Sequence, residues 1–165
     1  MFARLIAILF GLAAGAAGSQ APGFTLQYMQ NLTGRVEELR AVVARYDAVA
    51  AEAGLSREGY VADLRATGRT SADKTADAVE ETYARHEKLA AHLAALKAAG
   101  DYARPLVLAR RFEPDIARSA YAEYRPAIPA TLDGAAYAGG AFAVVWGGLS
   151  FLFGLFGTAG GRRYA

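Results

Sequence analysis

The sequence contains no cysteine. This absence excludes disulfide bonds, thiolate zinc sites, iron–sulfur clusters and a cysteine nucleophile. It leaves the cellular compartment open, because a chain without thiols is stable in oxidising and in reducing surroundings.

Charge is absent from both ends of the chain, apart from three arginines. All 16 acidic residues lie between Glu37 and Asp133, and 15 of the 18 Lys and Arg lie in residues 35–125. The middle of the chain is therefore close to neutral, and the excess of positive charge comes from Arg4, Arg162 and Arg163. Positive charge of this origin indicates membrane topology rather than nucleic-acid binding.

A long uncharged stretch occupies the C-terminal end, from Gly134 to Gly161. A helix needs about 20 apolar residues to cross the hydrocarbon core, so this stretch predicts a membrane span. Tyr137 and Tyr164 lie where interfacial aromatic residues are expected. Trp146 lies near the middle of the span, and it requires a packing explanation instead.

The N-terminal end has two interpretations. Arg4 precedes an apolar run from Leu5 to Gly18, which the small-residue site Ser19-Gln20-Ala21 follows. This is the anatomy of a cleavable signal peptide. The alternative is an uncleaved span that continues to about Tyr28, with Pro22 near the far interface, where a kink is tolerated.

The two ends also predict an orientation and a pairing. Basic residues prefer the cytoplasmic side, so Arg4, Arg162 and Arg163 place both termini inside and the middle outside. Small residues share one helix face in each apolar segment: Gly11, Gly15 and Gly18 in the first, and Gly140, Gly147, Gly154 and Gly161 in the second. Because small residues let helices approach closely in lipid, we expect the two spans to pack as a hairpin through these faces. That pairing favours the uncleaved alternative.

The middle region shows a helical period. Apolar residues alternate in steps of three and four from Met29 to Ala53, namely Met29, Leu32, Val36, Leu39, Val43, Tyr46, Ala50 and Ala53. This seam predicts a long helix with coiled-coil character that ends at Gly54. Ser56 is the expected cap of a short helix that runs to about Ala66 and closes at Gly68.

A second long helix is predicted from about Ser71 to Ala99. Its apolar stripe is Val79, Tyr83, His86, Leu89 or Ala90, Leu93 and Leu96. Glu113-Pro114-Asp115 begins a further short helix with proline in its first turn. Pro126 and Pro129 link it to the last span, for which Thr131 is the expected cap.

No pattern in the chain predicts catalysis. His86 and His92 are six residues apart, which places them about 240° apart on a helix and prevents them from binding one metal ion. The adjacent carboxylates Glu37-Glu38 and Glu80-Glu81 point about 100° apart, so a solvated face is the better interpretation. Arg110 and Arg111 are expected at the surface, where they could meet anionic lipid headgroups. The last span holds no ionisable residue, which disfavours ion or proton transport.

Several segments resemble one family of small bacterial membrane proteins, known as domain of unknown function 2937. They are Ser19-Gln20-Ala21-Pro22-Gly23-Phe24, Gln27-Tyr28-Met29-Gln30, Gly34-Arg35-Val36-Glu37-Glu38-Leu39-Arg40, Glu113-Pro114-Asp115-Ile116-Ala117 and Tyr124-Arg125-Pro126-Ala127-Ile128-Pro129. Gly23 stands where the family often has an acid. The resemblance implies a Gram-negative inner-membrane protein with terminal hydrophobic segments and helices between them. It implies no activity or cofactor, and it favours an uncleaved first span.

The sequence thus predicts an all-α protein in which two terminal transmembrane helices flank a long helical hairpin and two short helices. The expected parts are an N-terminal transmembrane helix or signal-anchor (1–28), a periplasmic helical region (29–130), a C-terminal transmembrane helix (131–161) and a cytoplasmic tail (162–165). Whether the first segment is cleaved stays open.

The expected function is that of a non-enzymatic scaffold or accessory subunit. Its helical region would bind a protein partner or a second copy, and lipid would surround its spans. The alternative is an envelope factor that acts on lipid through Arg110 and Arg111. We expect no nucleic acid, small-molecule substrate, cofactor or metal, and we assign no catalytic or binding residue.

Overall fold

The computed structural model describes residues 2–127 and 131–159, with side-chain surroundings as far as residue 154. This part of the chain forms seven α-helices and no strand, which confirms the predicted all-α class. Expectations that involve Pro129, Gly161, Arg162, Arg163 and Tyr164 lie outside the described residues.

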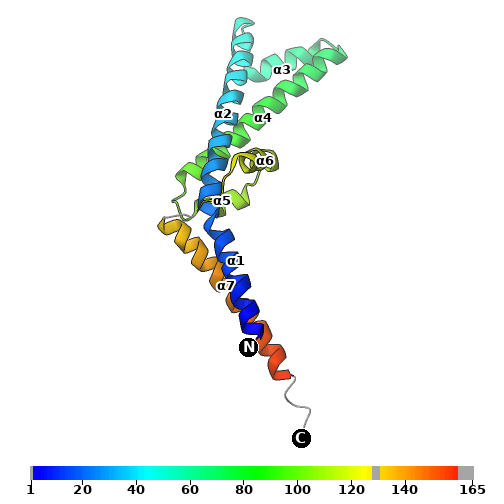
Figure 1. The fold of residues 1–165 in the computed structure, drawn as a ribbon. Coiled ribbons are helices and arrows are strands. Elements are labelled where there is room, and N and C mark those ends of the chain that lie inside the picture. Colours follow the sequence, from blue (N-terminus) through cyan, green and yellow to red (C-terminus); the bar gives the residue numbers. More distant parts are fainter. Residues whose placement is uncertain (1, 128–130, 160–165) are drawn as a thin grey trace.

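Two helices from opposite ends of the sequence form one end of the molecule. Helix α1 (Phe2–Ser19) packs antiparallel to α7 (Leu132–Ala159), and together we call them the hairpin. Figure 1 shows the hairpin projecting from a larger helical body, which we call the head (residues 21–127). Thr131 caps α7 as expected, since its Oγ1 accepts a hydrogen bond from the Gly134 amide at 3.4 Å.

A nearly continuous rod connects the hairpin to the head. A single residue, Gln20, separates the end of α1 from the start of helix α2 (Ala21–Glu52). Pro22 lies in the first turn of α2, where its missing amide proton interrupts the helical hydrogen-bond pattern. The first span was expected to continue to about Tyr28, but the break comes at Gln20. Tyr28 is fully buried in the head instead.

The head is a set of helices folded back along α2. Helix α3 (Arg57–Ala66) turns the chain at the far end, and α4 (Thr70–Ala98) returns antiparallel to α2 (Figure 1). Helices α5 (Arg104–Arg110) and α6 (Pro114–Glu123) then pack beside the lower part of α2. The two long helices and the helices at Ser56 and Pro114 confirm the sequence-based expectations.

Two apolar clusters hold the head together. The larger one lies nearer the hairpin, and it contains Tyr28, Leu32, Val36, Leu89, Leu93, Leu96, Leu108, Ile116, Ala117 and Ala120. The smaller one lies toward the far end, and it contains Val43, Val61, Ala76, Val79 and Tyr83. Leu32, Val36, Val43 and Ala50 of the predicted seam are buried, whereas Ala53 is exposed because α2 has already ended there.

An ion pair and a tyrosine fix the far corner of the head. The Arg57 guanidinium donates two hydrogen bonds to the Asp47 carboxylate, at 3.0 and 2.7 Å, and lies 4.1 Å from the centre of the Tyr83 ring. The Tyr83 hydroxyl donates to the same carboxylate at 3.1 Å. These hydrogen bonds, led by that of Arg57, hold the pKa of Asp47 below its ordinary value. These three residues join α2, α3 and α4, so the corner is held by side chains as well as by the α3 cap.

The structure corrects three details of the sequence-based picture. The head has a third short helix, α5, where the sequence predicted none; Pro105 in its first turn is compatible with a helix start. His86 was expected on the buried stripe of α4, but it is only half-buried. His92 takes the buried place instead, with 3% of its surface exposed.

Candidate functional site

The hairpin interface is built around the three glycines of α1. A Cβ atom added to Gly18 would lie 2.7 Å from the Ala141 Cβ and 2.8 Å from the Tyr137 carbonyl oxygen. One added to Gly15 would lie 3.0 Å from the Ala138 carbonyl oxygen. The two backbones approach so closely that only glycine fits, which confirms the predicted glycine face of α1.

The opposing face of α7 is not the one that was predicted. Gly140 and Gly147 have nothing within 4 Å of an added Cβ atom, so they do not face α1. At about 100° per residue, Gly140 lies roughly opposite Ala138 and Phe142, and those residues meet α1. Regular spacing locates a stripe of small residues, but it does not show which helix lies against it.

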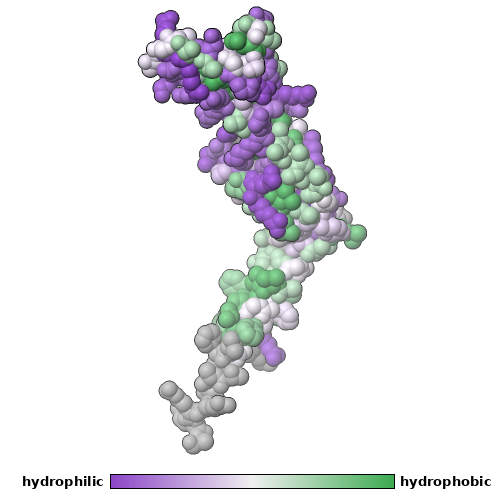
Figure 2. All heavy atoms as spheres, turned by 180° about the vertical axis from the view of Figure 1, so that it is seen from behind, coloured by the Kyte–Doolittle hydropathy of each residue, from purple (hydrophilic) through white to green (hydrophobic). Residues whose placement is uncertain are grey.

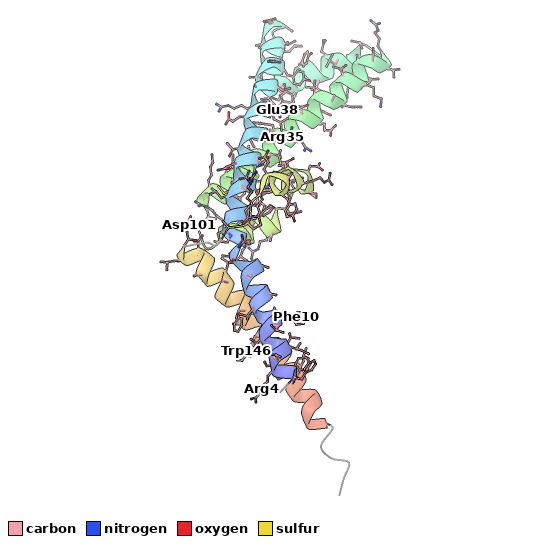
Figure 3. The ribbon with its side chains drawn as sticks, in the orientation of Figure 1. Arg4, Phe10, Arg35, Glu38, Asp101 and Trp146 are labelled. Atoms are coloured by element: carbon pink, nitrogen blue, oxygen red, sulfur yellow. The ribbon has the colours of Figure 1, made fainter. Side chains whose placement is uncertain are left out.

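The position of Trp146 follows from the same interface. Its Cβ lies 3.0 Å from the place of a Cβ on Gly11, and its ring stacks on Phe142 with centroids 6.0 Å apart. Figure 3 shows Trp146 on the hairpin, with Arg4 toward the free end of α1 and Asp101 at the opposite end. The tryptophan thus packs beside Gly11 through its Cβ and on Phe142 through its ring while 42% of its surface stays exposed, which is the packing explanation for its mid-span position.

Both hairpin helices are long and apolar enough to cross a membrane. Helix α1 has 18 residues, which corresponds to about 27 Å of helix. Large apolar side chains point outward from it, including Leu5, Leu9, Phe10 and Leu12, and from α7, including Val144 and Phe151. Figure 2 shows this change of surface, from a largely hydrophilic head to a hydrophobic hairpin.

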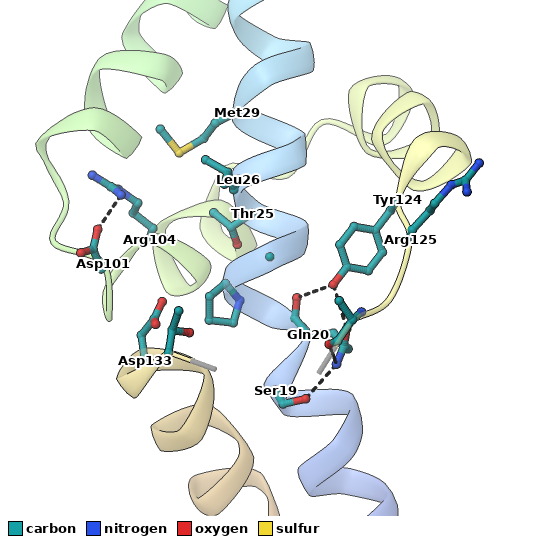
Figure 4. Close-up of a pocket in the computed structure, with 14 residues that line it drawn as sticks. Ser19, Gln20, Thr25, Leu26, Met29, Asp101, Arg104, Tyr124, Arg125 and Asp133 are labelled. Carbon is teal, nitrogen blue, oxygen red and sulfur yellow. Dashed lines mark hydrogen bonds and ion pairs between the residues drawn. The ribbon is translucent and has the colours of Figure 1, made fainter. Parts of the chain in front are cut away.

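A polar hub ties the hairpin to the head at Gln20 (Figure 4). The Gln20 amide donates to Ser19 Oγ at 2.9 Å and to the Ala127 carbonyl at 3.1 Å. Its carbonyl oxygen accepts from the Tyr124 hydroxyl at 3.0 Å and from the Ala127 amide at 3.2 Å. The side chain of Gln20 thus already uses its donors and acceptors within the chain, beside a cavity of about 460 Å³ between the hairpin and the head.

A second cavity has a different character. It measures about 310 Å³, and its lining, which we call the basic pocket, is Lys88, His92, Arg110, Arg111, Phe112 and Glu113. Lys88 and His92 share one face of α4, one turn apart, while Arg110 is the last residue of α5 and Arg111 follows it. Glu113 precedes α6, and its carboxylate lies 2.6 Å from the Lys88 ammonium group.

His92 is the unusual group in this pocket. Its ring lies 5.6 Å from that of Tyr28, and neither ring nitrogen has a hydrogen-bond partner in the part of the chain that the structure describes. Burial lowers the pKa of His92; Glu113 acts in the opposite direction, and Arg111 and Lys88 add to the lowering. The imidazole is therefore neutral at neutral pH, with one donor and one acceptor unused.

The backbone beside His92 is fixed by Tyr28. The hydroxyl of Tyr28 accepts a hydrogen bond from the Glu113 amide at 3.2 Å, and burial raises the pKa of this phenol to about 12. Tyr28 thus stays protonated while it orients the segment that carries Glu113. The buried side of the basic pocket, where His92 and the backbone of Glu113 lie, is consequently part of the ordered core of the head.

The structure gathers some of the residues weighed in the sequence and separates others. Arg110 and Arg111 lie with His92, whereas His86 is not among the residues that line the basic pocket. Within the described residues, no three His, Asp or Glu side chains form a group that could hold a metal ion. Sequence reasoning missed Gln20, Lys88 and Glu113 as site residues, since no local motif marks them.

Comparison with known proteins identifies a family for this chain. Residues 2–162 match the family described as "Protein of unknown function (DUF2937)". No curated protein and no solved structure matches the chain. Because the match covers both hairpin helices and the whole head, the chain belongs to this family of proteins of unknown function.

Proposed function

We propose that the protein is a non-enzymatic scaffold or accessory subunit of a bacterial inner membrane, and that it acts by binding a protein partner or a second copy of itself. The hairpin anchors it, and α2, which follows α1 directly after Gln20, extends the head outward from the membrane. The observation that carries this proposal is the outward face of α7. Gly140, Val144, Gly147 and Phe151 lie on it, away from α1, and they offer another helix a small-residue surface of the kind that packs in lipid.

The proposed topology places both termini in the cytoplasm and the head in the periplasm. Arg4 at the free end of α1 supports this orientation, because basic residues stay on the cytoplasmic side. The close packing of α1 on α7 supports retention of the first span, since cleavage after Ala21 would remove the partner of α7.

We expect mass spectrometry of the membrane-extracted protein to recover residues 1–21.

The chain has no cysteine, so a Lys97→Cys variant carries a single thiol on the exposed side of α4. A membrane-impermeant maleimide should label it from the periplasmic side. Loss of residues 1–21, or labelling only after the cells are lysed, would contradict the two-span topology.

Self-association predicts disulfide cross-linking at the outward face of α7. A Gly147→Cys variant oxidised in native membranes should give a covalent dimer, because two copies of this face would bring the thiols together. The matched control is Leu9→Cys, which places a thiol on the lipid-exposed side of α1. A monomer for both variants, together with no protein captured by the purified full chain, would remove the support for this function.

A further inference from the structure

The basic pocket contains a polar group that the fold itself leaves unsatisfied. His92 is 3% exposed, it lines the cavity, and both its ring nitrogens lack a partner among the described residues. Leaving a buried polar group unpaired destabilises the fold, so such groups call for an explanation. An apolar side chain in the same place would pack against Tyr28 without this cost, hence packing alone does not account for a histidine.

The charges around the cavity indicate what kind of group would satisfy it. Lys88, Arg110 and Arg111 bring three positive charges, and Glu113 brings one negative charge that pairs with Lys88. Neither arginine side chain has an ion-pair partner in residues 2–127 and 131–159. A metal ion is disfavoured by three cations, whereas an oxyanion would be attracted by them and could accept a hydrogen bond from the imidazole.

The position of the pocket favours an anion from the aqueous phase. Tyr28, which the His92 ring touches, lies eight residues beyond the break at Gln20, and this corresponds to about 12 Å along α2. The cavity of about 310 Å³ is small, near the lower limit of ligand sites. A lipid headgroup at the end of the hairpin would have to rise by this distance to reach His92.

We propose that the basic pocket binds a small soluble oxyanion with a phosphate-like group, held by Lys88, Arg110 and Arg111 and hydrogen-bonded by His92. The Lys88–Glu113 ion pair positions the lysine at the rim. Arg110 and Arg111 supply planar donors that match an oxyanion, and the imidazole contacts it from the buried side. Binding of this anion goes beyond the scaffold function, and neither requires the other.

The experiment uses the full chain in nanodiscs of uncharged lipid, with ¹⁵N-labelled histidine. The chain has two histidines, so His86 is an internal control on the same helix. Inorganic phosphate, added at constant ionic strength against chloride, should shift the His92 ring signals in a saturable manner and leave those of His86 in place. The pKa of His92 should rise with phosphate bound, because a nearby anion favours the imidazolium form.

Charge-removing variants test the pocket itself. Lys88→Gln and Arg111→Gln should each weaken phosphate binding about tenfold, the effect of losing one charge-assisted hydrogen bond. Lys97→Gln, an exposed lysine of the same helix outside the pocket, should leave binding unchanged. All three side chains are exposed, so the fold should survive, which circular dichroism checks.

Three results would overturn the proposal. The first is the absence of a saturable His92 shift with phosphate. The second is equal binding by Lys88→Gln, Arg111→Gln and Lys97→Gln. The third is a His92 shift that nanodiscs of phosphatidylglycerol produce without phosphate while free phosphate produces none, because the ligand would then be a lipid headgroup.

Discussion

Replacing Gly18 by leucine is expected to open the α1·α7 hairpin and to lower its stability by about 3 kcal/mol or more. A Cβ atom at this position would lie 2.7 Å from the Ala141 Cβ and 2.8 Å from the Tyr137 carbonyl oxygen. One of these atoms belongs to the backbone, so no change of side-chain rotamer relieves the clash. Overpacking in a core costs about 1–3 kcal/mol, and more where a helix backbone has to move.

The measurement can use the single tryptophan of the chain as its reporter. Trp146 packs on the same interface, so its fluorescence follows separation of the two helices during a titration with SDS. Gly18→Leu should shift the transition to a lower SDS fraction. Gly139→Leu is the matched control, because nothing lies within 4 Å of an added Cβ there and the gain in helix propensity is the same. Equal transitions for the two variants would show that the hairpin does not depend on this close approach.

The helices of this protein are encoded locally, and this is why the sequence predicted most of them. Ser56 accepts a hydrogen bond from the Gly59 amide at 3.0 Å, and Gly54 and Gly68 adopt positive φ angles of 70° and 65°. Each is a short-range signal of a helix end, and each was assigned correctly. The pairing of α1 with α7 was also predictable, because each of these two helices carries a long uncharged apolar run, which starts at Leu5 in α1 and at Gly134 in α7.

The arrangement of side chains around the candidate site could not be predicted in the same way. His86 and His92 flank Leu89 at equal spacing, about 60° to either side of it, so the periodicity of α4 gives no choice between them. His92, and not His86, faces the core, where Tyr28 and Glu113 lie near it; both of these residues come from distant parts of the chain. Likewise, the glycine stripe of α7 is regular in sequence, but the alanine and aromatic residues on the other side of the helix fit the α1 glycines better.

Replacing Tyr28 by alanine is expected to remove about 3–5 kcal/mol from the stability of the head, which is the range for truncating a buried aromatic residue. Tyr28 is fully buried in the larger apolar cluster, and it contacts His92. Tyr28→Phe keeps the ring and removes only the acceptor of the Glu113 amide, at an expected cost of about 1–3 kcal/mol. The two variants therefore separate packing from hydrogen bonding.

Denaturant unfolding of the full chain, followed by circular dichroism, measures both losses. Tyr121→Ala provides the control, since this tyrosine of α6 is 74% exposed and its removal should change the stability by less than about 0.5 kcal/mol. Tyr28→Ala should be the least stable variant, followed by Tyr28→Phe. If Tyr28→Ala unfolded together with the control, the cluster around Tyr28 would not be the core of the head. If Tyr28→Phe, but not Tyr28→Ala, were as stable as the control, the hydrogen bond from the Glu113 amide to the Tyr28 hydroxyl would contribute no stability. The segment that carries Glu113 would then be held beside the basic pocket by packing alone.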